Sequence, residues 1–238
     1  MRIKFAGLAA MAVLLALFGL VSSNAEDNQR RDAGRSVSPQ REKEQAQLAA
    51  GDVVLSRSRI YVLVGKTGLG HEHGVIGNLQ SGQVLFGSKE SAGQLVFDMA
   101  SFDADSQAAR KYVGLKGETD NNTRKQVNAN MLGPDVLDTK KFPTATFTID
   151  SAIPIKPAAG RKNLRYELQG SFTLHGVTNP LKLICEATPQ KDGVRLTTGF
   201  IARQSDYGIK PFSKAFGAIG VADELKIWGD LTIANGDQ

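Results

Sequence analysis

Strict alternation of apolar and polar side chains in residues 164–187 constrains the fold more than any other feature. The apolar members of its first half are Leu164, Tyr166, Leu168, Phe172 and Leu174, and polar residues or Gly170 separate them. A period of two places the two sets on opposite faces of a β-strand. After His175-Gly176 the alternation resumes through Leu181, Leu183, Cys185 and Ala187. The segment therefore predicts an antiparallel hairpin with one apolar and one solvated face.

The same pattern recurs along most of the chain. Further strand-like segments occupy residues 53–64, 75–79, 84–86, 95–99, 144–153, 194–202 and 225–233. Residues 106–115 and 123–132 lack the alternation and contain good helix formers, and Gly133-Pro134 ends the second of them. We expect an all-β fold of about eight short strands, a sandwich or a barrel, with one or two short helices inserted around residues 106–132.

The N-terminus is typical of a secretory signal peptide. Arg2 and Lys4 precede an apolar run over residues 5–21, and Ser23-Asn24-Ala25 is a small-residue cleavage site. An uncleaved membrane anchor is the alternative, since the run approaches the length needed to span a bilayer. We expect a cleaved signal peptide over residues 1–25, a flexible polar tether over 26–50 and one β-barrel or sandwich domain over 51–238. The mature protein is then soluble and periplasmic or secreted.

Charge and cysteine content narrow the function classes. Removal of residues 1–25 leaves 29 − 2 = 27 basic residues against 24 acidic ones, a mild excess spread along the chain. Nucleic-acid binding requires a concentrated basic patch, so we expect none. Cys185 is the single cysteine and lies on the apolar face of its strand, which excludes an intrachain disulfide and favours a buried, inert thiol.

Three histidines are the main candidates for metal or acid–base chemistry. His71 and His73 flank Glu72, and on a strand both imidazoles would lie on one face. A metal site needs a third ligand, and His175 is more typical of a turn residue. The chain contains no nucleophile elbow, P-loop, dinucleotide fingerprint or metalloprotease motif. We therefore predict no catalytic residue, metal or cofactor; the alternative is a metal-linked or redox-linked enzyme that uses His71, Glu72 and His73.

Four motifs in order resemble those of the YceI-like family of secreted, lipocalin-like proteins that bind isoprenoid lipids. They are Asp138–Phe147 (D-T-K-K-F-P-T-A-T-F), Gly170–Pro180 (G-S-F-T-L-H-G-V-T-N-P), Arg203–Ile209 (R-Q-S-D-Y-G-I) and Gly220–Ile227 (G-V-A-D-E-L-K-I). The resemblance covers about residues 57–234. The chain departs from the family pattern near its start, where Ser58–Val64 carries no histidine and Gly70–Gly74 supplies a Gly-His-Glu-His-Gly element instead.

The resemblance implies an eight-stranded antiparallel lipocalin-like barrel whose interior holds a long isoprenoid, such as a polyprenyl phosphate or a quinone. It implies a non-enzymatic binding, transport or sequestration function, with transient membrane contact and a dimer as open possibilities. The expected ligand-binding residues are His71, His73, Phe97, Phe147, Phe172, Arg203, Asp206, Phe212 and Phe216. His71, His73, Arg203 and Asp206 would hold the polar end of the lipid. Residues 209–219 could form a lid over the barrel mouth. One alternative for the function is a filled barrel with a stress or interaction role. The alternative for Arg203 and Asp206 is a structural ion pair.

Overall fold

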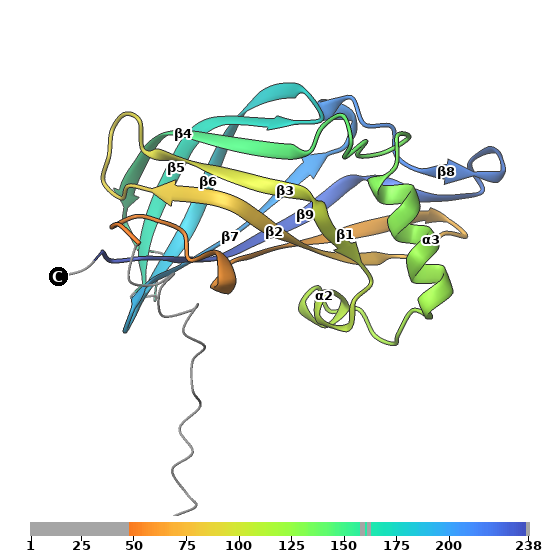
Figure 1. Cartoon of the computed structure of the whole chain (residues 1–238), viewed down its shortest axis with the longest axis horizontal. Coiled ribbons are helices and arrows are strands. Elements are labelled where there is room, and N and C mark those ends of the chain that lie inside the picture. Colours follow the sequence, from red (N-terminus) through yellow and green to blue (C-terminus); the bar gives the residue numbers. More distant parts are fainter. Residues whose placement is uncertain (1–47, 158–159, 161–162, 237–238) are drawn as a thin grey trace, which may run out of the picture. The chain divides into compact units, whose positions relative to one another are not determined.

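Eight long antiparallel strands hydrogen-bond to their neighbours in chain order, and the last of them pairs with the first (Figure 1). The computed structural model describes residues 48–157, 160 and 163–236. The strands are β1 (Arg59–Gly68), β2 (His73–Val84), β3 (Gly93–Ala104), β4 (Thr144–Ile155), β5 (Leu164–Leu174), β6 (Val177–Gln190), β7 (Gly193–Arg203) and β9 (Ile219–Ile233). A two-residue strand, β8 (Ser213–Lys214), pairs with the start of β9. The predicted eight-stranded antiparallel barrel is confirmed.

The predicted signal peptide and residues 26–47 of the predicted tether lie outside the described residues. Within the described chain, Gly51 donates its backbone N–H to Ala234 O and accepts a hydrogen bond from Val84 N. The segment predicted as a strand over residues 53–64 is divided. Residues Leu55–Arg57 form a 3-10 turn, η1, and β1 begins only at Arg59.

Two helices interrupt the barrel between β3 and β4. Helix α2 spans Gln107–Tyr112, and the Ser106 hydroxyl caps it by accepting a hydrogen bond from Ala109 N. Helix α3 spans Asn121–Leu132, and the Asp120 carboxylate caps it. Both caps satisfy backbone donors that the first turn of a helix leaves unpaired. The predicted helical insertion is confirmed, and it consists of two helices.

The β5–β6 hairpin forms as the alternation predicts. Leu174 pairs with Val177, so His175 and Gly176 alone make the turn. Both have positive φ, 51° and 78° respectively. A two-residue turn of this hand matches the twist of the flanking strands. The inward set of this hairpin includes Leu168, Leu183 and the free Cys185.

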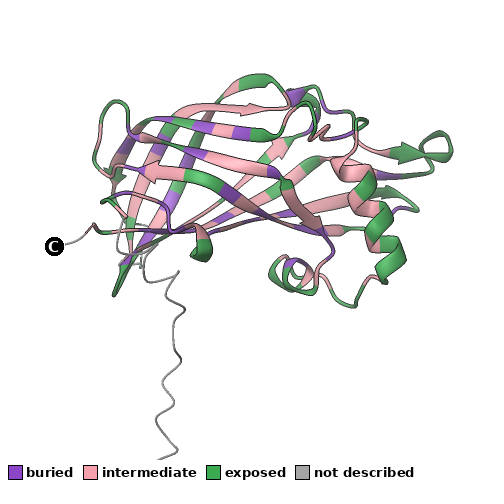
Figure 2. Cartoon of the chain, viewed as in Figure 1, coloured by how far each residue is buried: buried purple, intermediate pink, exposed green. Residues whose placement is uncertain are grey.

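The two ends of the barrel differ in how they are filled. We call the end that carries η1 and the β6–β7 turn the base, and the end that carries α2, α3 and the β5–β6 turn the mouth. Near the base, Val84, Ile149, Leu168 and Ile233 are fully buried and belong to one apolar core. Most buried positions lie on the strands, and α3 has no buried residue (Figure 2). The inward-facing residues nearer the mouth surround a cavity.

No helix in the described part of the chain is long and apolar enough to cross a membrane.

Candidate functional site

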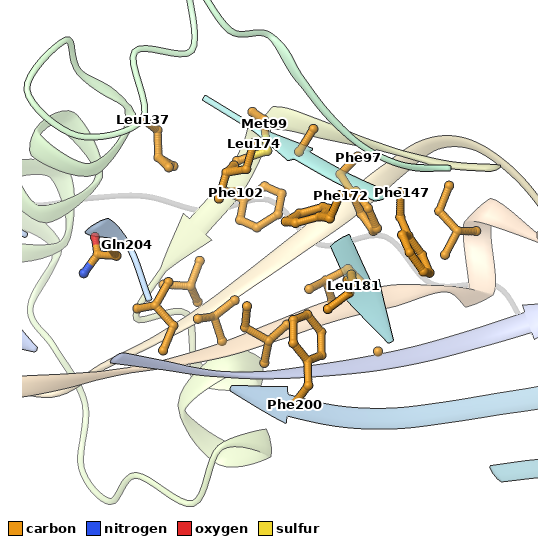
Figure 3. Close-up of a pocket in the computed structure, with 18 of the residues that line it drawn as sticks. Phe97, Met99, Phe102, Leu137, Phe147, Phe172, Leu174, Leu181, Phe200 and Gln204 are labelled. Carbon is orange, nitrogen blue, oxygen red and sulfur yellow. The ribbon is translucent and has the colours of Figure 1, made fainter. Parts of the chain in front are cut away.

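An apolar cavity of about 160 Å³ occupies the barrel interior on the mouth side (Figure 3). All eight long strands contribute to its wall, because alternate residues of each strand point inward. The strand residues that line it are Ile60, Val62, Val64, Val75, Leu95, Phe97, Met99, Phe102, Ala145, Phe147, Phe172, Leu174, Leu181, Leu183, Thr198, Phe200, Leu225, Ile227, Gly229 and Leu231.

Aromatic rings form much of this wall. Phe147 and Phe172 are paired across β4 and β5, and the Phe97 ring meets the Phe172 ring edge to face at 6.0 Å between centroids. Gly77 of β2 lies directly beneath Phe102, since a Cβ on this glycine would come within 2.7 Å of three ring atoms. A side chain at position 77 would therefore displace the ring from the cavity wall.

Two described lining residues carry polar side chains. The Thr198 hydroxyl donates to Ile184 O at 3.0 Å, so the wall of the barrel already satisfies it. Gln204 is buried and lies at the mouth side of the cavity, beyond the last inward residues of β7 (Figure 3). Its Nε2 donates to Ala222 O at 2.8 Å. The cavity can therefore hold an apolar chain, with one amide at its rim.

The mouth is narrowed by residues that follow the strands. Met131 of α3, Val136 and Leu137 of the next loop, and Ile209 after β7 complete the lining. Val136, Tyr207 and Ile209 form a second apolar cluster of their own. The turn η2 (Ser205–Tyr207) ends at Gly208, whose φ of 68° returns the chain toward the barrel. This turn is what brings Ile209 back over the interior.

The structure divides the predicted ligand-binding residues into two groups. Phe97, Phe147 and Phe172 line the cavity. Arg203 and Asp206 do not line it; both are exposed at the mouth end. Arg203 faces outward because Phe200 and Ala202 take the inward positions of β7. In the described part of the chain these two residues form no ion pair with each other.

His71 and His73 also lie at the mouth end but outside the lining. His71 is exposed in the β1–β2 turn. The Nδ1 of His73 lies 2.7 Å from Oδ2 of the buried Asp105, and Oδ1 of that carboxylate accepts hydrogen bonds from Gly74 N and from Arg110. Burial by itself would raise the pKa of Asp105, but the contacts with His73, Gly74 and Arg110 outweigh it and lower the pKa. This cluster fastens α2 to β2.

Phe212 and Phe216 lie on the segment between β7 and β9. Phe212 is half-buried and packs against the second apolar cluster, beside the cavity mouth. Phe216 is fully exposed, in the 3-10 turn η3 (Ala215–Gly217) between β8 and β9. Neither lines the cavity. From the predicted lid over residues 209–219, Ile209 alone contributes to the described lining.

The described residues hold no cluster suited to a metal ion, and the single cysteine is buried. Within them, no three His, Cys, Asp or Glu side chains lie close enough to hold a metal ion. Cys185 is 1% exposed, and this burial raises the pKa of its thiol to about 11. The thiolate is therefore scarce at neutral pH, and this cysteine packs as a small apolar residue.

Sequence patterns left several lining residues unassigned. Phe200 lies on the strand predicted over residues 194–202 and is not among the predicted ligand-binding residues, although its inward register follows from the alternation of β7. Gln204, Met131, Val136 and Leu137 lie outside strands, so no alternation marks them. The glycine of Tyr207-Gly208-Ile209 is a sequence signal for Ile209 alone, because it indicates a turn that reverses the chain after it.

The chain is similar to known proteins in sequence and in fold. The model of the YceI-like domain matches residues 52–233. A search of the curated proteins finds no match. A polyisoprenoid-binding domain from Saccharophagus degradans, implicated in plant cell wall breakdown, is 14% identical with a TM-score of 0.54, over 79% of this chain and 99% of that one. BcnA from Burkholderia cenocepacia is 20% identical with a TM-score of 0.49, over 76% and 98%. Since the family model covers most of the sequence, the chain belongs to the YceI-like family.

Proposed function

We propose that this protein binds a long apolar isoprenoid lipid inside the barrel and transports or sequesters it without chemical change. The observation that carries the proposal is the cavity, whose described lining is apolar apart from Thr198 and Gln204. Each CH₂-sized group moved from water into such a site gains about 0.8 kcal/mol. The fold shared with a domain described as polyisoprenoid-binding supports the same class of ligand.

The cavity is too small for a long isoprenoid unless the protein adjusts. A volume of about 160 Å³ is close to that of engineered protein cavities of roughly 150 Å³ that admit one benzene molecule. A chain of several isoprene units therefore requires lining side chains to move. Met99 and Met131 suit this, because their unbranched thioether side chains change rotamer easily. The head group, a phosphate or a quinone ring, would stay at the mouth.

Polar residues at the mouth can meet that head group. Gln204 provides an amide at the rim. Arg203, the preceding residue, and His71 are exposed at the same end, and a guanidinium there could pair with a phosphate or polarise a quinone carbonyl. We place the protein in the periplasm, on the evidence of the N-terminal sequence pattern.

Mass spectrometry of an organic extract and metal analysis, both on one purified sample, test the proposal. We expect a bound isoprenoid and no stoichiometric metal. A stoichiometric metal without lipid would support the rival enzyme that uses His71, Glu72 and His73. A sample with neither would support a filled barrel.

A cavity-filling variant sharpens this test. Ala145 is buried in the cavity wall, so Ala145→Leu should reduce lipid occupancy while it leaves the melting temperature equal or higher. Thr148→Leu, on the exposed face of the same strand, is the matched control and should keep its lipid. Arg203→Ala tests the head-group role, since it should lower occupancy at an unchanged melting temperature. Full occupancy in Ala145→Leu would exclude the barrel interior as the binding site.

A further inference from the structure

Two neighbouring turns at the mouth form a projection that we call the tip, residues 65–71 and 210–221. The end of β1 pairs with the start of β9, with Gly68 opposite Ile219, and β8 flanks β9 on its other side. Leu69 N donates to Ala218 O at 2.9 Å, which joins the two turns directly. Figure 1 shows the β8–β9 hairpin extending from the barrel end that carries α3.

Three large apolar side chains are exposed together on the tip. Phe216 is 113% exposed relative to a reference residue, Leu69 79% and Ile219 42%. The hydrogen bond between the turns and the Gly68–Ile219 register hold them at one corner of the molecule. Single exposed apolar residues are ordinary, whereas a group of them marks an interaction site.

The backbone holds Phe216 in an unfavourable conformation. Ala215 and Phe216 have φ values of 50° and 55°, and Gly217 follows at 93°. The left-handed region is costly for residues with a Cβ, above all for a bulky one. Phe216 makes no core contact that would offset this cost, since its side chain is fully exposed. The strain therefore presents the ring to solvent without any gain in packing.

The charges of the tip are of one sign. Residues 65–71 and 210–221 include Lys66, Lys210 and Lys214 and contain no aspartate or glutamate. Exposed apolar side chains on segments that also carry lysines suit the surface of an anionic bilayer, where the apolar groups enter the headgroup region and the ammonium groups meet lipid phosphates.

We propose that the tip docks this protein on an anionic lipid bilayer through Phe216, Leu69 and Ile219, with the three lysines in contact with lipid head groups. Such docking sets the mouth of the barrel near the membrane surface. Ile209, which lines the cavity, immediately precedes the second segment of the tip. Docking does not depend on what the cavity holds, so the proposal stands apart from the proposed function.

Flotation of the protein with lipid vesicles tests the proposed docking of the tip. The purified protein should float with vesicles of phosphatidylethanolamine and phosphatidylglycerol, and much less with vesicles of phosphatidylethanolamine and phosphatidylcholine. Phe216→Gly should weaken partitioning about tenfold or more, because one aromatic side chain no longer enters the bilayer. Lys66→Gln and Lys214→Gln should each weaken it about fivefold, and added salt should weaken it further.

The controls separate docking from misfolding. Glycine accepts the backbone conformation at position 216, so Phe216→Gly should melt at the same temperature as the wild type or higher. Ile201→Ser removes an exposed apolar side chain from the outer wall, and Lys191→Gln removes a lysine at the base; both should float like the wild type. All variants share the same N-terminus, so differences between them belong to the substituted side chain.

Three results would overturn the proposal. The wild type could fail to float with the anionic vesicles, Phe216→Gly could float equally well, or Ile201→Ser could lose as much binding as Phe216→Gly. Analytical ultracentrifugation adds a fourth. A wild-type dimer that Phe216→Gly converts to a monomer, with no flotation of either protein, would assign the tip to contact between two copies of this chain.

Discussion

At the scale of single residues, Asp105 shows how one buried carboxylate can organise the mouth of the barrel. Its φ is 58°, in the left-handed region that aspartate and asparagine tolerate better than most residues. The bend turns the chain from β3 into α2 and aims the carboxylate back at β2. There His73, Gly74 and Arg110 converge on its two oxygens.

Replacing Asp105 with asparagine should expose the stability contributed by its charge. The folded-state pKa lies below the ordinary value of 3.8, so the contribution is present above that value and is lost as the pH falls through the folded-state pKa. We expect Asp105→Asn to lower the free energy of unfolding by about 1–3 kcal/mol at neutral pH. Urea denaturation across a pH series should show this difference shrinking in acid.

Asparagine can adopt the same backbone conformation, so a loss in this variant reports the charge and its hydrogen bonds. Asp150→Asn, which removes an exposed carboxylate on β4, is the matched control and should change stability little at any pH. A difference between wild type and Asp105→Asn that stays constant into acid would contradict the assignment.

At the scale of elements, the contact between α2 and the barrel depends on a missing side chain. A Cβ at Gly74 would lie within 3.0 Å of Ala109 C and Arg110 N, which are backbone atoms of the helix. Close approach of α2 also brings Tyr112 onto Tyr61 of β1. The two rings stack with their centroids 3.5 Å apart and an interplanar angle of 4°. The position of α2 and the stacking of the two tyrosines therefore both depend on the missing side chain at Gly74.

Gly74→Ala should push α2 away from β2 and destabilise the protein by about 1–3 kcal/mol, as overpacking does elsewhere. The Tyr61–Tyr112 stack should loosen at the same time, and near-ultraviolet circular dichroism should record the change. Gly65→Ala serves as the control, because its Cβ would meet only the Ala222 side chain at 3.3 Å. If Gly74→Ala kept native stability and an unchanged aromatic spectrum, the position of α2 would not depend on this glycine.

At the scale of the whole molecule, the barrel is packed at its base and hollow toward its mouth. Leu168 is 1% exposed within the packed region, whereas Leu181 on the neighbouring strand is half-buried against the cavity. A side chain that borders empty space has fewer neighbours to lose. The same truncation should therefore cost different amounts at the two ends.

We expect Leu168→Ala to lower the free energy of unfolding by about 3–5 kcal/mol and Leu181→Ala by about half of that or less. Urea denaturation of lipid-free protein, with equal denaturant slopes for the two variants, is the measurement. Equal losses would mean that the interior is filled throughout, and that result would also weaken the proposed lipid function.

The amino-acid pattern predicted most of the strands with their inward faces, the β5–β6 turn and the helical insertion, because period-two alternation and turn residues are local properties. It therefore also identified Phe97, Phe147 and Phe172 as inward-facing. It was wrong in predicting separate strands over residues 75–79 and 84–86, where one strand, β2, runs from His73 to Val84, and in starting a strand at residue 53, since β1 begins only at Arg59. Which residues come together at the mouth follows from long-range packing alone. Ile209 joins the lining because the left-handed Gly208 returns the chain toward the barrel, and Met131 joins it because the inserted helix α3 lies at the mouth. Likewise, His73 contacts Asp105, 32 residues away, and Phe216 shares a corner with Leu69. These contacts between distant parts of the sequence arise from barrel closure between β1 and β9 and from long-range packing, which no local pattern encodes.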